Sequence, residues 1–191
     1  LYAAIFAIAW YRSWRELNLL GFAFTFGIGT LWGIEHYSPD KFATTLPFLL
    51  LFFGFYLLLP LLHARRADAA GRRIVDASLV FGTPLVAFAQ LAALLDDEVH
   101  ALAASALGLG ALYALLARWR LTPVPLLQQA YAALAVGFAT LAAPLALSAE
   151  ATASVFALEG AALVWFGTAQ SRRLPRWAGT ALQVLAALQM A

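Results

Sequence analysis

The segment Phe42–Leu62 has the sequence FATTLPFLLLFFGFYLLLPLL and indicates the fold class of this chain. It carries no charged side chain and is apolar on every face of a helix, as helices immersed in lipid are. The hydrocarbon core of a bilayer is about 30 Å thick, and a helix needs about 20 residues to cross it. A membrane β-strand needs only about 9–11 residues that alternate in polarity, and this segment does not alternate. It is therefore predicted to cross a membrane as an α-helix.

The composition of the whole chain agrees with that prediction. Of the 191 residues, 63% are hydrophobic and only 12% are charged, about half the roughly 25% found in soluble domains. These values exclude a soluble globular protein and a disordered chain, and the net charge of +2 gives no basis for binding nucleic acid. The chain has no cysteine, so disulfides and thiolate metal sites are also excluded.

Apolar runs of this kind recur along the chain and predict about eight helices. They cover residues 1–10, 17–34, 42–62, 75–95, 101–117, 126–147, 152–169 and 177–190. We expect an all-α, polytopic transmembrane helical bundle that forms a single transmembrane region over residues 1–191. The first and last runs are short and the chain opens without Met, so we expect a fragment of a longer membrane protein.

Charges between the runs alternate in sign along the chain. The basic loops carry Arg12 and Arg15; Arg65, Arg66, Arg72 and Arg73; Arg118 and Arg120; and Arg172, Arg173 and Arg176. The intervening loops carry Lys41 with Glu35, Asp40, Asp96, Asp97, Glu98 and Glu150. Because short loops rich in Lys and Arg stay on the cytoplasmic side, the Arg-rich loops are predicted to be cytoplasmic.

An internal repeat accompanies this alternation. Thr25, Thr83 and Thr140 lie in similar contexts rich in Phe, Gly or Ala, at spacings of 58 and 57 residues. Each is followed by an acidic loop and then by a run that ends in Arg. The repeating unit is therefore predicted to be a helical hairpin, as is common in transport proteins and also in duplicated scaffolds.

Small residues mark the expected contacts between helices, because close packing drives helix association in lipid. Four of them are spaced by four residues in the run 17–34 and so share one ridge. The expected packing residues are Gly21, Thr25, Gly29, Gly33, Gly110 and Gly137. Pro84 and Pro144 lie inside runs and are expected to kink their helices.

Glu159 is the strongest functional candidate. It lies nine residues after Glu150 and thirteen before Arg172, which places it near the middle of the membrane. A carboxyl group there is costly, which points to proton or cation handling or to a polar ligand. The structural alternative is a protonated Glu159 that forms a hydrogen bond to a neighbouring helix.

The acidic loops could in principle hold a divalent cation, but their residues lack a fixed ligand spacing. No phosphate-binding loop, dinucleotide fingerprint, nucleophile elbow or zinc helix is present. We therefore predict no metal, no cofactor and no catalytic residue. The expected partners are the lipid bilayer and, for a scaffold, other membrane subunits.

Four stretches resemble a large bacterial family of predicted integral membrane proteins, the domain-of-unknown-function 2339 family. They are Trp14–Phe22, Phe26–Gly33, Leu79–Phe88 and Ala157–Trp165. The resemblance implies a bacterial inner-membrane location and a longer parent protein, and it transfers no catalytic residue. Asn18 and Glu159 fall within these stretches, so both are candidates for handling a ligand or a proton.

Three classes of function follow from these observations. The repeat, the kinked helices and Glu159 favour a transporter or channel for a small solute, ion or lipid. The sparse polar interior favours a membrane scaffold or a subunit of an envelope complex. An enzyme that acts on envelope lipids or glycans would need its residues in the acidic loops, and the residue inventory argues against an enzyme.

Overall fold

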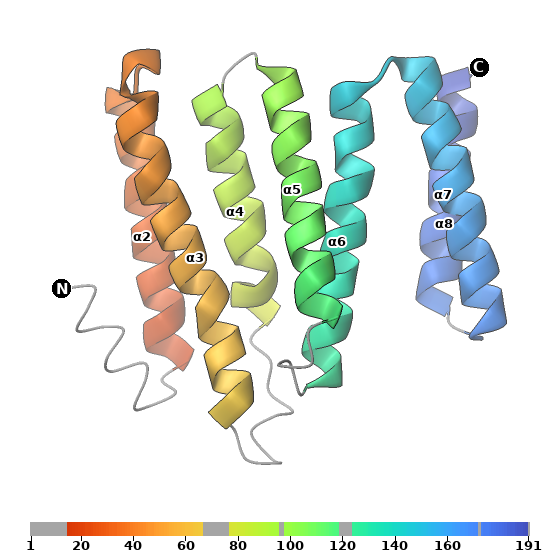
Figure 1. Cartoon of the computed structure of the whole chain (residues 1–191), viewed down its shortest axis with the longest axis horizontal. Helices are drawn as coiled ribbons and strands as arrows, with labels where there is room; N and C mark the ends of the chain where they lie inside the picture. Colours follow the sequence, from red (N-terminus) through yellow and green to blue (C-terminus); the bar gives the residue numbers. More distant parts are fainter. Residues whose placement is uncertain (1–14, 67–76, 96–97, 119–123, 172, 191) are drawn as a thin grey trace. The chain divides into compact units, whose positions relative to one another are not determined.

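The computed structural model describes residues 15–66, 77–95, 98–118, 124–171 and 173–190, and within them the only regular structure is helical. Figure 1 follows the helices along the chain. They are α2 (Arg15–His36), the 3₁₀ turn η1 (Pro39–Lys41), α3 (Phe42–Arg66), α4 (Ala77–Leu95), α5 (Val99–Arg118), α6 (Pro125–Ala146), α7 (Ala149–Ala169) and α8 (Arg173–Met190). The all-α prediction is confirmed.

The number of helices needs a correction. The described residues contain seven α-helices rather than eight, because the run 1–10 lies outside them. Six of the seven, α2 to α7, are long and apolar enough to cross a membrane. The seventh, α8, was expected to cross as well and does not qualify. The helix begins at Arg173, four residues before the predicted run 177–190. Arg173, Arg176 and Gln183 make the mean hydropathy of the whole helix lower than that of the six candidate spans.

Local chemistry explains where α7 begins and ends. The Ser148 side chain caps α7 by accepting a hydrogen bond from the backbone N–H of Ala151 at 3.4 Å. After α7 the chain turns at Ser171, whose φ of 53° lies in the left-handed region. Left-handed residues commonly end helices because they redirect the backbone and satisfy the last carbonyls. The next helix, α8, then runs back along α7 (Figure 1).

The chain divides into two compact units. The first unit comprises Leu1–Asp97 and Ala111–Ala135, and the second comprises Glu98–Gly110 and Val136–Ala191. Helices α5 and α6 therefore contribute to both units, and each unit is treated separately below. A single transmembrane region over residues 1–191 stays a prediction.

The first unit is held together by aromatic contacts and by hydrogen bonds between helices. Phe22 and Phe26 of α2 lie 5.5 and 5.7 Å from the ring of Tyr56 on α3, measured between ring centroids. Beyond the end of α2, the Tyr37 hydroxyl donates a hydrogen bond to the Leu94 carbonyl of α4 at 2.6 Å. The loops that follow α2 and α4 are both acidic, and this bond brings their ends together.

The second unit contains a small alanine-rich core and the closest helix contact of the described chain. Ala143, Ala153, Phe156 and Ala186 are buried together, from α6, α7 and α8. At the α6–α7 turn, the Thr152 hydroxyl donates to the Ala143 carbonyl at 3.4 Å. The small side chains at these positions let the helices approach each other closely, as is typical of membrane proteins.

Candidate functional site

The candidate site is a contact between α6 and α7 in the second unit. Thr140 of α6 donates a hydrogen bond from its Oγ1 to Oε2 of Glu159 on α7, over 2.7 Å. Both side chains are half-buried. The partner of Glu159 is thus a residue of the neighbouring helix, 19 positions earlier in the sequence.

The depth of Glu159 follows from its position in α7. The candidate span covers Ala151–Ala169, so Glu159 lies about 12 Å from one end and about 15 Å from the other along the helix axis. A carboxyl group in the middle of a bilayer is strongly disfavoured unless it has a polar partner. The Thr140 hydroxyl is such a partner, and it reduces the cost of keeping Glu159 at this depth.

A tight backbone contact lies directly beside Glu159. Gly160 of α7 faces Gly179 of α8 so closely that a Cβ atom on Gly160 would lie 2.7 Å from the Gly179 carbonyl oxygen. In the reverse direction, a Cβ on Gly179 would lie 2.5 Å from the Gly160 carbonyl oxygen. Real Cβ atoms essentially never approach that closely. The contact with the α8 backbone therefore fixes the position of α7 along its axis, and its rotation about that axis, next to the carboxyl group of Glu159.

Asn18, the second candidate, lies on α2 in the first unit. It is buried, with 4% of its surface exposed. Glu159 belongs to the second unit, so the two candidates lie in different units of the chain. A role for Asn18 in ligand or proton handling stays a prediction.

Three of the expected packing residues on α2 face side chains of other helices. Thr25 shares a hydrogen bond of 3.2 Å with the Tyr56 hydroxyl of α3. A Cβ on Gly21 would lie 3.1 Å from the same hydroxyl, and one on Gly29 would lie 3.6 Å from Nε2 of Gln90 on α4. The α2 ridge therefore faces polar side chains of α3 and α4.

The other expected packing residues have different surroundings. Gly110 is buried in α5. Among the described residues, nothing lies within 4 Å of the place that a Cβ would take at Gly33 or Gly137. Their packing role stays a prediction. The tightest contact, between Gly160 and Gly179, was not predicted, because no spacing within a single run links residues of two different helices.

The Gln90 amide joins α4 to α2 within the first unit. Its Nε2 donates to the Phe26 carbonyl at 2.9 Å and to the Thr30 hydroxyl at 2.7 Å. The Thr30 hydroxyl in turn donates to the same carbonyl at 2.8 Å. This closed set of hydrogen bonds satisfies polar groups that would otherwise face lipid.

The acidic loops bring one carboxylate and one imidazole close together in the part of the chain that the structure describes. Nδ1 of His36 lies 3.8 Å from a carboxylate oxygen of Glu35, and both side chains are exposed. The described residues contain no group of three His, Cys, Asp or Glu that could hold a metal ion. Asp96 and Asp97 lie outside them. The expectation of no metal and no cofactor stays a prediction.

Comparisons with known proteins agree with this description. A family model described as "Predicted membrane protein (DUF2339)" matches residues 1–191. The curated proteins give no match, and neither do the solved structures.

Proposed function

Because the chain belongs to the DUF2339 family of predicted membrane proteins, we propose that it is a multi-pass transporter or channel for a small solute, ion or lipid. In this proposal Glu159 is the group that takes up and releases a proton or a cation. The observation that carries the proposal is the position of the Glu159 carboxyl group near the middle of the α7 span. The Thr140 hydroxyl is the polar partner that the structure gives it there.

The chemistry of the pair suits a group that changes its protonation state. A threonine hydroxyl donates to an ionised carboxylate, and it accepts a hydrogen bond from a protonated one. Thr140 therefore has a favourable interaction with Glu159 in both states. Because the two residues lie on different helices, a change at the carboxyl group alters the contact between α6 and α7.

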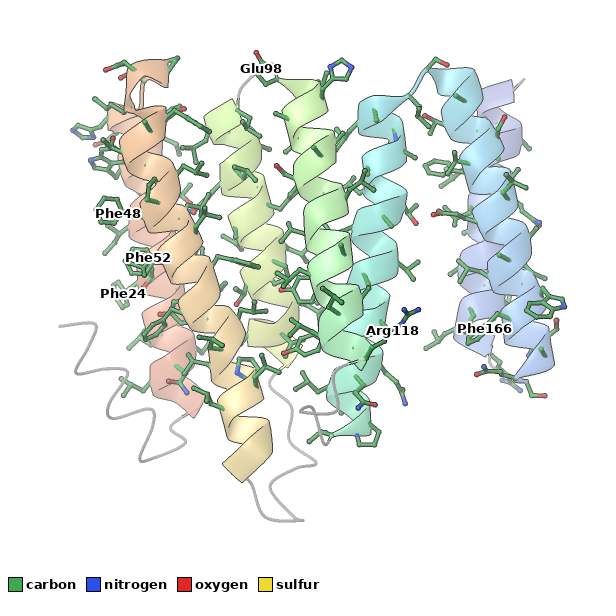
Figure 2. The ribbon with its side chains drawn as sticks, viewed as in Figure 1. Phe24, Phe48, Phe52, Glu98, Arg118 and Phe166 are labelled. Carbon is green, nitrogen blue, oxygen red and sulfur yellow. The ribbon has the colours of Figure 1, made fainter. Side chains whose placement is uncertain are left out.

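The orientation in the membrane is part of the proposal. Glu98 and Arg118 lie at opposite ends of α5, as Figure 2 shows. The positive-inside rule then places the Arg118 end in the cytoplasm and the Glu98 end outside, and we propose the bacterial inner membrane as the location. Arg65 and Arg66 at the end of α3 belong to the same cytoplasmic side in this proposal.

Proton flux through the full-length protein tests the proposal without knowledge of the solute. The protein is reconstituted in liposomes that contain a trapped pH-sensitive dye, and a pH gradient is imposed. We expect the wild-type protein to collapse the gradient faster than empty liposomes do. Glu159→Gln should abolish the difference, because glutamine matches the shape of glutamate but does not titrate.

Two further variants make the flux experiment specific. Glu98→Gln removes an exposed carboxyl group at the end of α5 and serves as the matched control, with flux expected at the wild-type level. Thr140→Ser keeps a hydroxyl group next to Glu159 and should preserve the flux. A Glu159→Gln protein that conducts protons like the wild type would contradict the proposal.

A membrane scaffold, or a subunit of an envelope complex, is the second candidate. It is supported by the large lateral apolar surface, since only 17–33% of the residues in each candidate span are buried. The remaining residues are partly or fully exposed and offer apolar area to lipid or to other membrane subunits. Native mass spectrometry of the gently extracted full-length protein tests this alternative. A stoichiometric protein partner together with wild-type flux in Glu159→Gln would favour the scaffold.

A further inference from the structure

Three hydroxyl side chains are almost completely buried in the first unit. Thr83 on α4, Tyr113 on α5 and Tyr131 on α6 are 1%, 0% and 1% exposed. Within the described part of the chain, neither Oγ1 of Thr83 nor the Tyr131 hydroxyl oxygen has a hydrogen-bond partner. Buried hydroxyl groups in folded proteins are nearly always hydrogen-bonded, either to protein atoms or to ordered water.

A second unpaired group lies one turn away from Thr83. Pro84 follows Thr83 inside α4 and has no N–H to donate to the carbonyl of Val80, four residues earlier. Val80 is itself buried, with 3% of its surface exposed. One turn of α4 therefore presents a carbonyl without its usual helical N–H donor and a hydroxyl group without a hydrogen-bond partner among the described residues.

The internal repeat relates Thr83 to Tyr113. In the first hairpin, Thr25 of α2 and Tyr56 of α3 share a hydrogen bond of 3.2 Å. Thr83 and Tyr113 follow them by 58 and 57 residues, on the two helices of the next hairpin. In the repeat, Thr83 and Tyr113 thus correspond to Thr25 and Tyr56, the pair that forms a hydrogen bond in the first hairpin.

Tyr131 extends this cluster to a third helix. The rings of Tyr113 and Tyr131 lie 5.6 Å apart, measured between centroids, with their planes inclined by 44°. Helices α4 and α6 carry no charged side chain over Ala77–Leu95 and Pro125–Ala146. A charged ligand would thus find no countercharge on these two helices, whereas a small neutral molecule would find both donors and acceptors.

We propose that Thr83, Tyr131 and the Val80 carbonyl bind an ordered water molecule inside the membrane-spanning part of the first unit. The water donates one hydrogen bond to the Val80 carbonyl and exchanges hydrogen bonds with the two hydroxyl groups. A buried water typically makes about three such bonds to polar groups that lack protein partners. Pro84, which is expected to kink α4, then also creates a hydration site by leaving the Val80 carbonyl without its helical donor.

The sign of a stability change tests the proposal. Thr83→Val and Tyr131→Phe each remove one hydroxyl group and leave the shape of the side chain nearly unchanged. If both groups bind water, each substitution lowers the unfolding temperature of the full-length protein in detergent by a few degrees. If the groups are truly unpaired, the substitutions raise the unfolding temperature or leave it unchanged, because a buried unpaired hydroxyl is itself destabilising. That result would overturn the proposal.

Two comparisons complete the test. Thr25→Val removes the hydrogen bond to Tyr56 at the equivalent repeat position, so it calibrates the loss of one hydroxyl partner in this protein. In the double variant of Thr83→Val and Tyr131→Phe, a shared water predicts a smaller loss than the two single losses added together. Strictly additive losses would show that no water links the two side chains.

Direct detection uses water-edited solid-state NMR on tyrosine-labelled protein in lipid. Polarisation from water should reach the Tyr131 ring, and Thr83→Val should weaken the transfer. Absence of transfer to Tyr131 in the wild-type protein would refute the hydration site. The measurement does not depend on Glu159, which belongs to the second unit. Its result therefore tests the hydration site independently of the proposed transport function.

Discussion

Helices associate differently in the two units of this protein. In the second unit, α7 and α8 meet backbone to backbone at Gly160 and Gly179. In the first unit, side chains such as Tyr56 and Gln90 reach from one helix to the next and form hydrogen bonds. A backbone contact leaves no room for any side chain, whereas a side-chain contact can be lost one bond at a time. Substitutions should therefore have larger effects at the α7–α8 contact than in the first unit.

The largest effect is expected from Gly160→Ala. The added methyl group would overlap the Gly179 carbonyl, and a backbone atom cannot move aside as the end of a flexible side chain can. Overpacking of this kind costs about 1–3 kcal/mol. The free energy of unfolding of the full-length protein in mixed micelles measures the loss.

Gly137→Ala is the matched control for this substitution. Among the described residues, nothing lies within 4 Å of the Cβ position at Gly137, and alanine favours helices by about 0.5–1 kcal/mol over glycine. We expect Gly137→Ala to be neutral or slightly stabilising. Equal stabilities of the two variants would show that α7 and α8 do not meet at Gly160.

Thr140→Val should have the next largest effect on stability. It leaves the Glu159 carboxyl group at mid-span without its donor from α6. Hydrogen bonds to charged groups contribute about 1.5–3 kcal/mol, and neutral ones contribute about 1 kcal/mol. We expect a loss of about 1 kcal/mol in the free energy of unfolding, and Thr140→Ser should recover most of it. A fully stable Thr140→Val protein would place the Glu159 partner elsewhere.

Gln90→Leu probes the side-chain contacts of the first unit. It removes both hydrogen bonds that the Gln90 amide donates to α2 while keeping a side chain of similar size. Hydrogen bonds between membrane helices contribute about 0.6 kcal/mol on average and about 1.7 kcal/mol at most. We expect a loss within that range, measured in the same unfolding assay. A loss as large as that of Gly160→Ala would remove the distinction between the two units.

Phe48→Leu should have the smallest effect. The Phe48 side chain is 62% exposed on α3 and lies with Phe24 and Phe52 along the outer side of α2 and α3 (Figure 2). Substitutions at exposed positions usually change stability by less than about 0.5 kcal/mol. A clear loss of stability would indicate that this aromatic side chain packs against another protein rather than against lipid.

The contrast between the two units also explains what could be predicted from the sequence. Hydropathy located the helices well, because the cost of burying charge in lipid is a property of each run by itself. The run 42–62, for example, became α3 over Phe42–Arg66. The hydropathy of the predicted run 177–190 did not distinguish α8 from the six candidate spans. That run left out Arg173 and Arg176, which belong to the helix and lower its mean hydropathy.

Contacts between helices were much harder to predict. The spacing of small residues identifies a ridge on one helix, but it does not say which helix lies opposite. Gly160 and Gly179 belong to different runs, so no periodicity joins them. In the same way, Glu159 was identified from its depth, while its partner Thr140 was known only as a member of the repeat. Pairing depends on the three-dimensional packing, which a single sequence does not specify.

The most direct test of the proposed function is an infrared titration of the Glu159 carboxyl group in the full-length protein in lipid. We predict a carboxyl band that changes with pH, is absent in Glu159→Gln and shifts in frequency when Thr140→Val removes the neighbouring hydroxyl. Such a band would show that Glu159 exchanges protons within the membrane while bound to Thr140. A spectrum in which Glu159→Gln removes no titrating band would contradict the account.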